Sequence, residues 1–338
     1  EVVFKGASPF GPFVSYPGNP ILTQRHLGLE APIANTGHAD LVQCRDGSWY
    51  MVFLASRPYG GYHKNLGRET FIAPVIWEEG WPVVSPGTGK ILFSYDGPDL
   101  PAFPVPEEPV RDDFDQEKLS FVWNFLGTPE KDLYHIENGF LKLRLHEKSL
   151  GKGLEEIQEP GGLETPGSLG FLGRRQQHLS FTASAKMRFV PREKQTAGLT
   201  VLQHGFHQIR LEIGRNGNGE VVMRALRCYR SLDVSLIHKK AGAAYLEEVL
   251  REIPWNEEEA VLVISAENQA YRLSAVHGDG SRESLCTVDG GFLGSETAGG
   301  FVGAYIGMFA SGNGTGYQEY AAFDWFEYRG IDNPQQSE

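Results

Sequence analysis

Short apolar runs separated by Gly, Pro and Asn fill the first 95 residues of the chain. The run from Ser48 to Leu54, SWYMVFL, is one example, and no helical period accompanies it. Runs of this length between turn-forming residues are typical of antiparallel strands joined by tight turns. We therefore predict a β-domain over residues 1–95.

The next segment, residues 96–110, reads DGPDLPAFPVPEEPV and contains five prolines. Proline cannot donate a hydrogen bond to a sheet, so this composition indicates an extended linker or a strap across a surface. We place the domain boundary here.

Alternating apolar and polar positions return after residue 110. The clearest runs cover residues 140–145, 179–185, 199–202, 260–264, 301–307 and 322–328. A period of two in this many segments predicts a β-sandwich over 111–330, followed by a tail at 331–338. The one helix candidate is Ala241–Glu252, whose residues are good helix formers, although the following Ile253-Pro254 ends it abruptly and leaves a strand open.

Composition narrows the classes of protein. The 338 residues are 41% hydrophobic and 22% charged, enough to bury two cores, and no run of eighteen apolar residues predicts a membrane span. The formal net charge of −12 repels polyanions, which argues against nucleic acid and leaves neutral polysaccharides open. The three cysteines, Cys44, Cys228 and Cys286, form no CxxC pair and are interpreted as structural thiols.

The first residues, EVVFKG, contain no initiator Met and no signal-like segment. We expect a processed end or a cut through a longer protein. Localisation is not readable from this sequence; an extracellular location is favoured only if the source degrades biomass.

Five local motifs occur in a fixed order along the chain. They are NTGHAD at 35–40, NLGRET at 65–70, WEEGWPV at 77–83, GFLGRRQ at 170–176 and GGFVG at 299–303. The first three resemble the closing blades of family 43 β-xylosidases and α-L-arabinofuranosidases. The last two resemble the concanavalin-like sandwich appended to those enzymes.

The resemblance implies an all-β chain that carries the last blades of a five-bladed β-propeller, followed by a concanavalin-like β-sandwich. At about 40–50 residues a blade, residues 1–95 make about two blades. A propeller closes with about four to eight blades, so other strands must cover the exposed edges. We expect the partner to be the N-terminal propeller portion of the same enzyme.

The resemblance also implies an inverting glycosidase that needs no cofactor for its chemistry. Such enzymes use two carboxyl groups, one as base and one as acid. The family's base, its auxiliary Asp and its acid all fall upstream of Glu1, a register that ASPFGPF at 7–13 supports. We therefore expect no catalytic residue in this chain.

Three substrate-binding residues follow from the same resemblance. His38 is implied to lie beneath the sugar pocket; the alternative is a histidine packed in the core. Arg68 is implied to present its planar donors to sugar hydroxyls; the alternative is a surface ion pair with Glu69 or Glu79. Phe301 is implied to wall the active site, and core packing in a strand is its alternative.

Acidic residues lie at both ends of the predicted sandwich. Asp113, in the acidic cluster 112–115, and Asp324 could supply oxygen ligands to a structural calcium ion, whereas a solvated turn is the alternative. The Glu residues at 155, 156 and 159 lie in a Gly/Pro-rich stretch and are interpreted as a solvated loop.

The favoured interpretation is therefore part of a β-xylosidase or α-L-arabinofuranosidase that acts on xylo- or arabino-oligosaccharides. A non-catalytic carbohydrate-binding module and a purely structural sandwich remain the alternatives. The sequence does not separate xylosidase from arabinofuranosidase activity.

Overall fold

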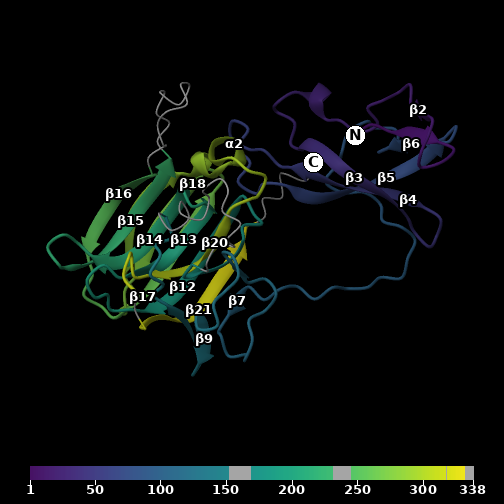
Figure 1. Cartoon of the computed structure of the whole chain (residues 1–338). Coiled ribbons are helices and arrows are strands. Elements are labelled where there is room, and N and C mark those ends of the chain that lie inside the picture. Colours follow the sequence, from purple (N-terminus) through teal and green to yellow (C-terminus); the bar gives the residue numbers. More distant parts are fainter. Residues whose placement is uncertain (152–168, 231–244, 317, 332–338) are drawn as a thin grey trace. The chain divides into compact units, whose positions relative to one another are not determined.

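The chain forms two units, Glu1–Glu107 and Glu108–Asp332, each with its own apolar core. The structure is a computed structural model that describes residues 1–151, 169–230, 245–316 and 318–331. The division between the units falls within the Pro-rich segment 96–110. Of the predicted tail, only Ile331 is described, and residues 155, 156 and 159 lie outside the described residues. Figure 1 shows the elements of each unit.

The first unit contains a hairpin and a four-stranded antiparallel sheet in its described part. The hairpin pairs β1 (Phe4–Gly6) with β2 (Phe13–Ser15), and η1 (Arg25–Leu27) follows it. The sheet runs in sequence order through β3 (Ala34–Gln43), β4 (Trp49–Ser56), β5 (Glu69–Glu78) and β6 (Trp81–Val84). Such a meander is the unit from which propeller blades are built.

Turn residues set the register of this sheet. Glu79 and Gly80 have φ of 50° and 78°, and they join β5 to β6 in the doubly left-handed turn that hairpins favour. At the β3–β4 turn, the Asp46 carboxylate accepts the Ser48 backbone N–H at 2.9 Å. These local bonds fix the alternation that buries Met51 and Phe53 of β4.

The second unit is a sandwich of two antiparallel sheets. One sheet has the order β19 (Arg282–Asp289), β18 (Ala270–Val276), β17 (Glu259–Glu267), β12 (Ser180–Arg188), β21 (Tyr320–Gly330), β10 (Phe140–Arg144) and β9 (Tyr134–Glu137), with β7 (Arg111–Asp112) also on β21. The other has the order β16 (Tyr245–Pro254), β15 (Val221–Arg230), β14 (His207–Arg215), β13 (Thr196–His204), β20 (Tyr305–Ser311), β11 (Phe171–Arg175) and β8 (Asn124–Phe125). Two short helices, η3 (Gly290–Leu293) and α2 (Ser295–Ala298), precede β20.

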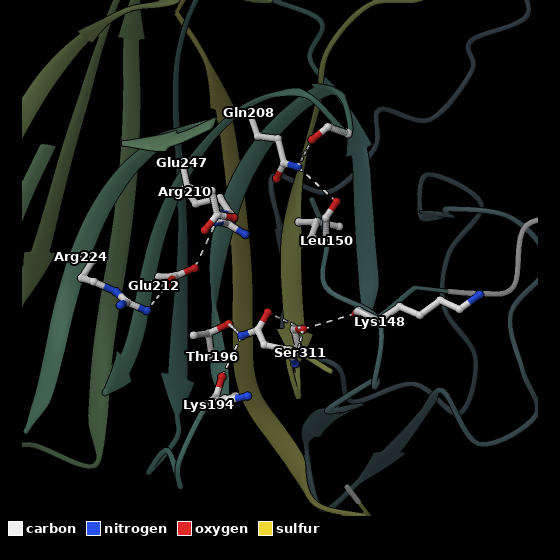
Figure 2. A network of polar contacts seen from close by, with 12 residues as sticks. Lys148, Leu150, Lys194, Thr196, Gln208, Arg210, Glu212, Arg224, Glu247 and Ser311 are labelled. Atoms are coloured by element: carbon white, nitrogen blue, oxygen red, sulfur yellow. Dashed lines mark hydrogen bonds and ion pairs between the residues drawn. The ribbon is translucent and has the colours of Figure 1, made fainter. Parts of the chain in front are cut away.

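The core of the sandwich lies between the sheets. Residues of one parity on each strand, such as Leu199 of β13 and Leu211 of β14, are fully buried there. On β14 the opposite parity is also buried, but it is polar: Arg210 and Glu212 are 3% and 2% exposed. Figure 2 shows the polar network that these outward-facing side chains form.

The structure differs from the predicted elements at two places, and at the first it shows the strand that the sequence left open. The helix candidate at 241–252 is instead strand β16 from residue 245 onward; residues 241–244 lie outside the described residues. Pairing with β15 outweighs the helix propensity. Glu248 pairs with Arg227 of the adjacent β15, and Glu247 reaches Arg210 of β14, one strand further into the sheet.

The strand predicted at 301–307 begins only at Tyr305. Gly299 and Gly300 have φ of 83° and 75°, so the chain turns sharply before the strand and leaves Phe301 in a loop.

Candidate functional site

Both predicted site residues of the first unit, His38 and Arg68, lie at one end of its four-stranded sheet. Gly37 of β3 pairs with Leu54 of β4, which pairs with Thr70 of β5. His38 follows Gly37, and Arg68 lies two residues before Thr70. The sheet register therefore brings His38 and Arg68 to the same end of the blade.

The His38 segment is held in an irregular backbone conformation. The β3–β4 register shifts between Ala34 and Gly37 and again between Gly37 and Asp40. Within these bulges Asn35 and His38 have positive φ, 55° and 54°, which is uncommon for residues other than glycine. The bulge leaves His38 exposed rather than packed in a core.

Glu1 supports this bulge from outside the sheet. Its Oε1 accepts the Ala39 backbone N–H at 3.0 Å, immediately after His38. The Glu1 backbone is in turn fixed, because its carbonyl accepts the Ile21 N–H at 3.0 Å. An amide without a β-ladder partner is thereby satisfied by a carboxylate.

The loop before Arg68 is built around a bidentate ion pair. Arg57 donates from Nε and Nη2 to the two carboxylate oxygens of Glu69, at 2.9 and 2.8 Å. This pair closes the loop at its base, where β4 ends and β5 begins. The Glu69 carboxylate, one of the two ion-pair partners considered for Arg68, is thus bound by Arg57.

The rest of the loop packs on itself. The backbones of Tyr59 and His63 form a reciprocal pair of hydrogen bonds at 3.0 and 2.9 Å, and Asn65 and Leu66 are 0% and 1% exposed. Tyr62 Oη donates to Asn35 Oδ1 at 3.3 Å, which joins the loop to the bulge of β3. Arg68 emerges exposed from this buried base.

Sequence reasoning missed Glu1, Arg57 and Tyr62. The sequence contains a signal for Arg57, since Arg and Glu flank the Gly/Tyr-rich stretch between two strand-like runs. It contains none for Glu1, because the bond to Ala39 spans 38 positions and depends on the bulge.

Phe301 belongs to the second unit. It follows α2 and the two left-handed glycines, and its side chain is 71% exposed. The loop is anchored by Gln203 of β13, whose Nε2 donates to the Val302 carbonyl at 2.8 Å. Phe301 is therefore not a core residue of a strand, which was its alternative, and it lies on the surface of its own unit.

The two carboxylates predicted to bind calcium each face a cation. Asp113 accepts from Arg111 at 2.7 Å, and Asp324 pairs with Lys186 at 3.0 Å. Across the described ranges, no group of three or more His, Cys, Asp or Glu side chains is arranged to hold a metal ion. The calcium site stays a prediction that this geometry does not support.

The helices of the described residues are short, and none is long and apolar enough to cross a membrane.

Comparison with known proteins decides the family. Residues 1–82 match the family described as "Glycosyl hydrolases family 43", and residues 111–329 match the "Beta xylosidase C-terminal Concanavalin A-like domain". The non-reducing end alpha-L-arabinofuranosidase BoGH43B of Bacteroides ovatus is 36% identical over 337 residues, 98% of this chain. The chain belongs to glycosyl hydrolase family 43.

Solved structures of family 43 proteins share the fold. The Bacteroides ovatus xyloglucan GH43B structure superposes with a TM-score of 0.81 at 34% identity, covering 98% of this chain and 60% of that one. A xylan beta-1,4-xylosidase from Bacillus halodurans gives 0.82 at 26% identity, covering 97% and 59%. The predicted all-β fold, with part of a propeller followed by a concanavalin-like sandwich, is confirmed.

The chain spans little more than half the length of its curated family 43 relatives. It covers 58% of the Bacteroides ovatus arabinofuranosidase. It covers 56% of a xylosidase/arabinosidase of Butyrivibrio fibrisolvens, to which it is 32% identical. The matched regions therefore contain one end of a propeller domain and a sandwich.

Proposed function

We propose that this chain is the C-terminal portion of an inverting family 43 glycoside hydrolase that releases xylosyl or arabinofuranosyl groups from xylan-derived or arabinose-substituted substrates. The catalytic carboxylates belong to the N-terminal propeller portion. That portion is either a separate partner polypeptide or part of one longer polypeptide with this chain. This chain contributes His38 and Arg68 to the substrate pocket, and Phe301 contributes an aromatic wall.

The observation that carries the proposal is the open end of the blade. His38 and Arg68 are both exposed, yet each is positioned by buried or bonded structure: the bulge held by Glu1 and the loop closed by Arg57 and Glu69. Ordered backbone that presents exposed polar groups is expected of one wall of a pocket.

Exposed apolar residues on the first unit support the proposal that further propeller blades pack against it. Phe4, Phe13 and Val14 of the hairpin are 54–59% exposed, and Ile76 and Trp77 of β5 are both 44% exposed. Large apolar residues exposed together on strands mark surfaces that pack against other structure. The remaining propeller blades are the partner that fits this surface.

The test is to coexpress this chain with the N-terminal propeller portion of the same gene and purify through a tag on one of them. We expect the two to copurify by intact mass and to release nitrophenol from nitrophenyl xyloside or nitrophenyl arabinofuranoside. The chain alone is expected to be inactive. Activity of the lone chain would contradict the assignment of the carboxylates, and an inactive copurified assembly would contradict the hydrolase assignment.

Glu1 is expected to act on the site through His38. In the active assembly, Glu1→Ala removes the acceptor of the Ala39 N–H and should lower kcat/KM by roughly tenfold, the equivalent of about 1.4 kcal/mol. Glu1→Gln keeps an oxygen at the same position and should restore most of the activity. Steady-state kinetics and melting curves of both variants check this.

A loss of activity that accompanies a lowered melting temperature equally in both variants would show that Glu1 only stabilises the unit.

A further inference from the structure

The motif GFLGRRQ places a cation inside the sandwich that the proposed function does not use. Arg174, on β11, is 9% exposed. Its guanidinium lies 4.9 Å from the ring centroid of Tyr328, and Nη2 donates to Gln177 Oε1 at 3.5 Å. Burial lowers the pKa of the Arg174 guanidinium, as expected for a cation removed from water.

Arg174 forms no ion pair with any residue that the structure describes. Other buried arginines of the sandwich do: Arg210, at 4% side-chain exposure, reaches both Glu212 and Glu247. A guanidinium has five donors, and a buried one is stable when an anion engages them. Arg174 therefore has unused donor capacity.

A cavity of about 720 Å³ lies beside this side chain. Arg174 contributes to its wall, and most of the remaining lining comes from residues 108–120, which include charged and polar side chains. The apolar part of the lining includes Val110, Val122, Trp123, Ile136 and Phe326. Small-molecule sites of about 300–1,000 Å³ typically combine apolar walls with a few polar groups.

Carboxylates also line the cavity. Those that already accept hydrogen bonds or pair with a cation repel a bound anion less than the others. Both Asp112 oxygens are engaged, since they accept the Phe114 N–H at 2.9 Å and the Trp123 Nε1–H at 2.8 Å. Asp113 pairs with Arg111. Glu108, Asp115 and Glu117 are exposed to solvent, where the high dielectric constant of water weakens their repulsion of a bound anion.

We propose that this cavity is a second, non-catalytic site of the sandwich, in which Arg174 binds the carboxylate of an acidic sugar, a hexuronate. The planar fork of guanidinium donors matches a carboxylate, and the apolar walls suit the C–H faces of a sugar ring. An acidic sugar is the carboxylate ligand favoured by membership of a glycosyl hydrolase family. The inference does not depend on the catalytic assignment.

Glu108 is the internal competitor. Its negative charge acts on Arg174, and both residues line the cavity. A ligand carboxylate must share or displace this interaction, so removing the Glu108 charge should tighten binding.

The test is calorimetric titration of the 338-residue chain with glucuronate, with glucose as the uncharged match and acetate as the carboxylate without a ring. We expect saturable binding of glucuronate, at least about tenfold weaker binding of acetate, and none of glucose. Arg174→Gln should weaken glucuronate binding at least about tenfold, whereas Glu108→Gln should tighten it about two- to fivefold.

Arg272→Gln is the matched control, because that arginine forms an exposed ion pair with Glu267 on the other sheet. If Arg174→Gln lowers the melting temperature too far to titrate, Arg174→Lys keeps the charge, loses the fork and should still weaken binding. No saturation by glucuronate, equal binding of acetate, or unchanged binding by both Arg174 variants would overturn the proposal.

Discussion

Arg68→Ala in the active two-part assembly is expected to lower kcat/KM by roughly 30- to 800-fold, about 2–4 kcal/mol of transition-state stabilisation, while the fold is retained. The Arg68 side chain is exposed, so its removal leaves no core cavity. Its backbone is fixed by the buried base of the loop and by Gly67 at φ 69°. The loss should therefore fall on activity rather than on stability.

The chain provides a control for Arg68. Arg45 is also exposed, but it lies in the β3–β4 turn at the opposite end of the blade. Arg45→Ala should leave kcat/KM within about twofold of the parent. Arg68→Lys should recover only part of the activity, because it restores the charge without the planar fork. Unchanged kinetics in Arg68→Ala would remove this residue from the site.

The architecture could be predicted because it depends on local pattern. The strands β10, β12, β17 and β21 coincide with predicted runs of period two, and β4 coincides with the predicted apolar run at 48–54. The end of the first unit followed from Pro-rich composition, and the family followed from motifs that are continuous in sequence. These features need no knowledge of long-range contacts.

Local propensity could not choose between the helix and the strand that the sequence left open at 241–252, and the structure shows the strand from residue 245 onward. Leu246, Glu247 and Glu248 suit an isolated helix, but in the edge strand β16 the carboxylates of Glu247 and Glu248 pair with arginines of the sheet. Pairing across the sheet is a tertiary effect, and propensity does not contain it.

The site could be predicted only in part. His38 and Arg68 lie in recognisable motifs, but the groups that hold them do not. The Glu1 bond to Ala39 depends on a bulge in β3, and the Arg57–Glu69 pair depends on the register of β4 with β5. Arg174 belongs to the GFLGRRQ motif of the sequence. Its burial without an ion pair to a described residue depends on long-range packing of the sandwich, which the sequence alone does not give.

The polar outer face of the central strands was not foreseen, and it carries the largest stability prediction. Glu212 of β14 is 2% exposed and lies between two arginines: its Oε1 accepts from Arg224 at 2.7 Å, and Oε2 lies 3.6 Å from Arg210 Nε. Figure 2 shows Arg224 beside Glu212, and Glu247 beside Arg210. Removing the Glu212 charge leaves the partly buried Arg224 without this carboxylate, and such a loss costs more than the pair itself contributes.

Glu212→Ala is therefore expected to lower the free energy of unfolding of the sandwich by about 3–5 kcal/mol, measured by urea denaturation. Glu248→Ala is the matched control, because Glu248 pairs with Arg227 on the same sheet at side-chain exposures of 44% and 36%. That variant should cost about 0–1 kcal/mol, since water replaces the lost partner. Equal losses in the two variants would show that burial does not set the strength of this network. A loss below about 1 kcal/mol in Glu212→Ala would show that Glu247 alone can neutralise Arg210.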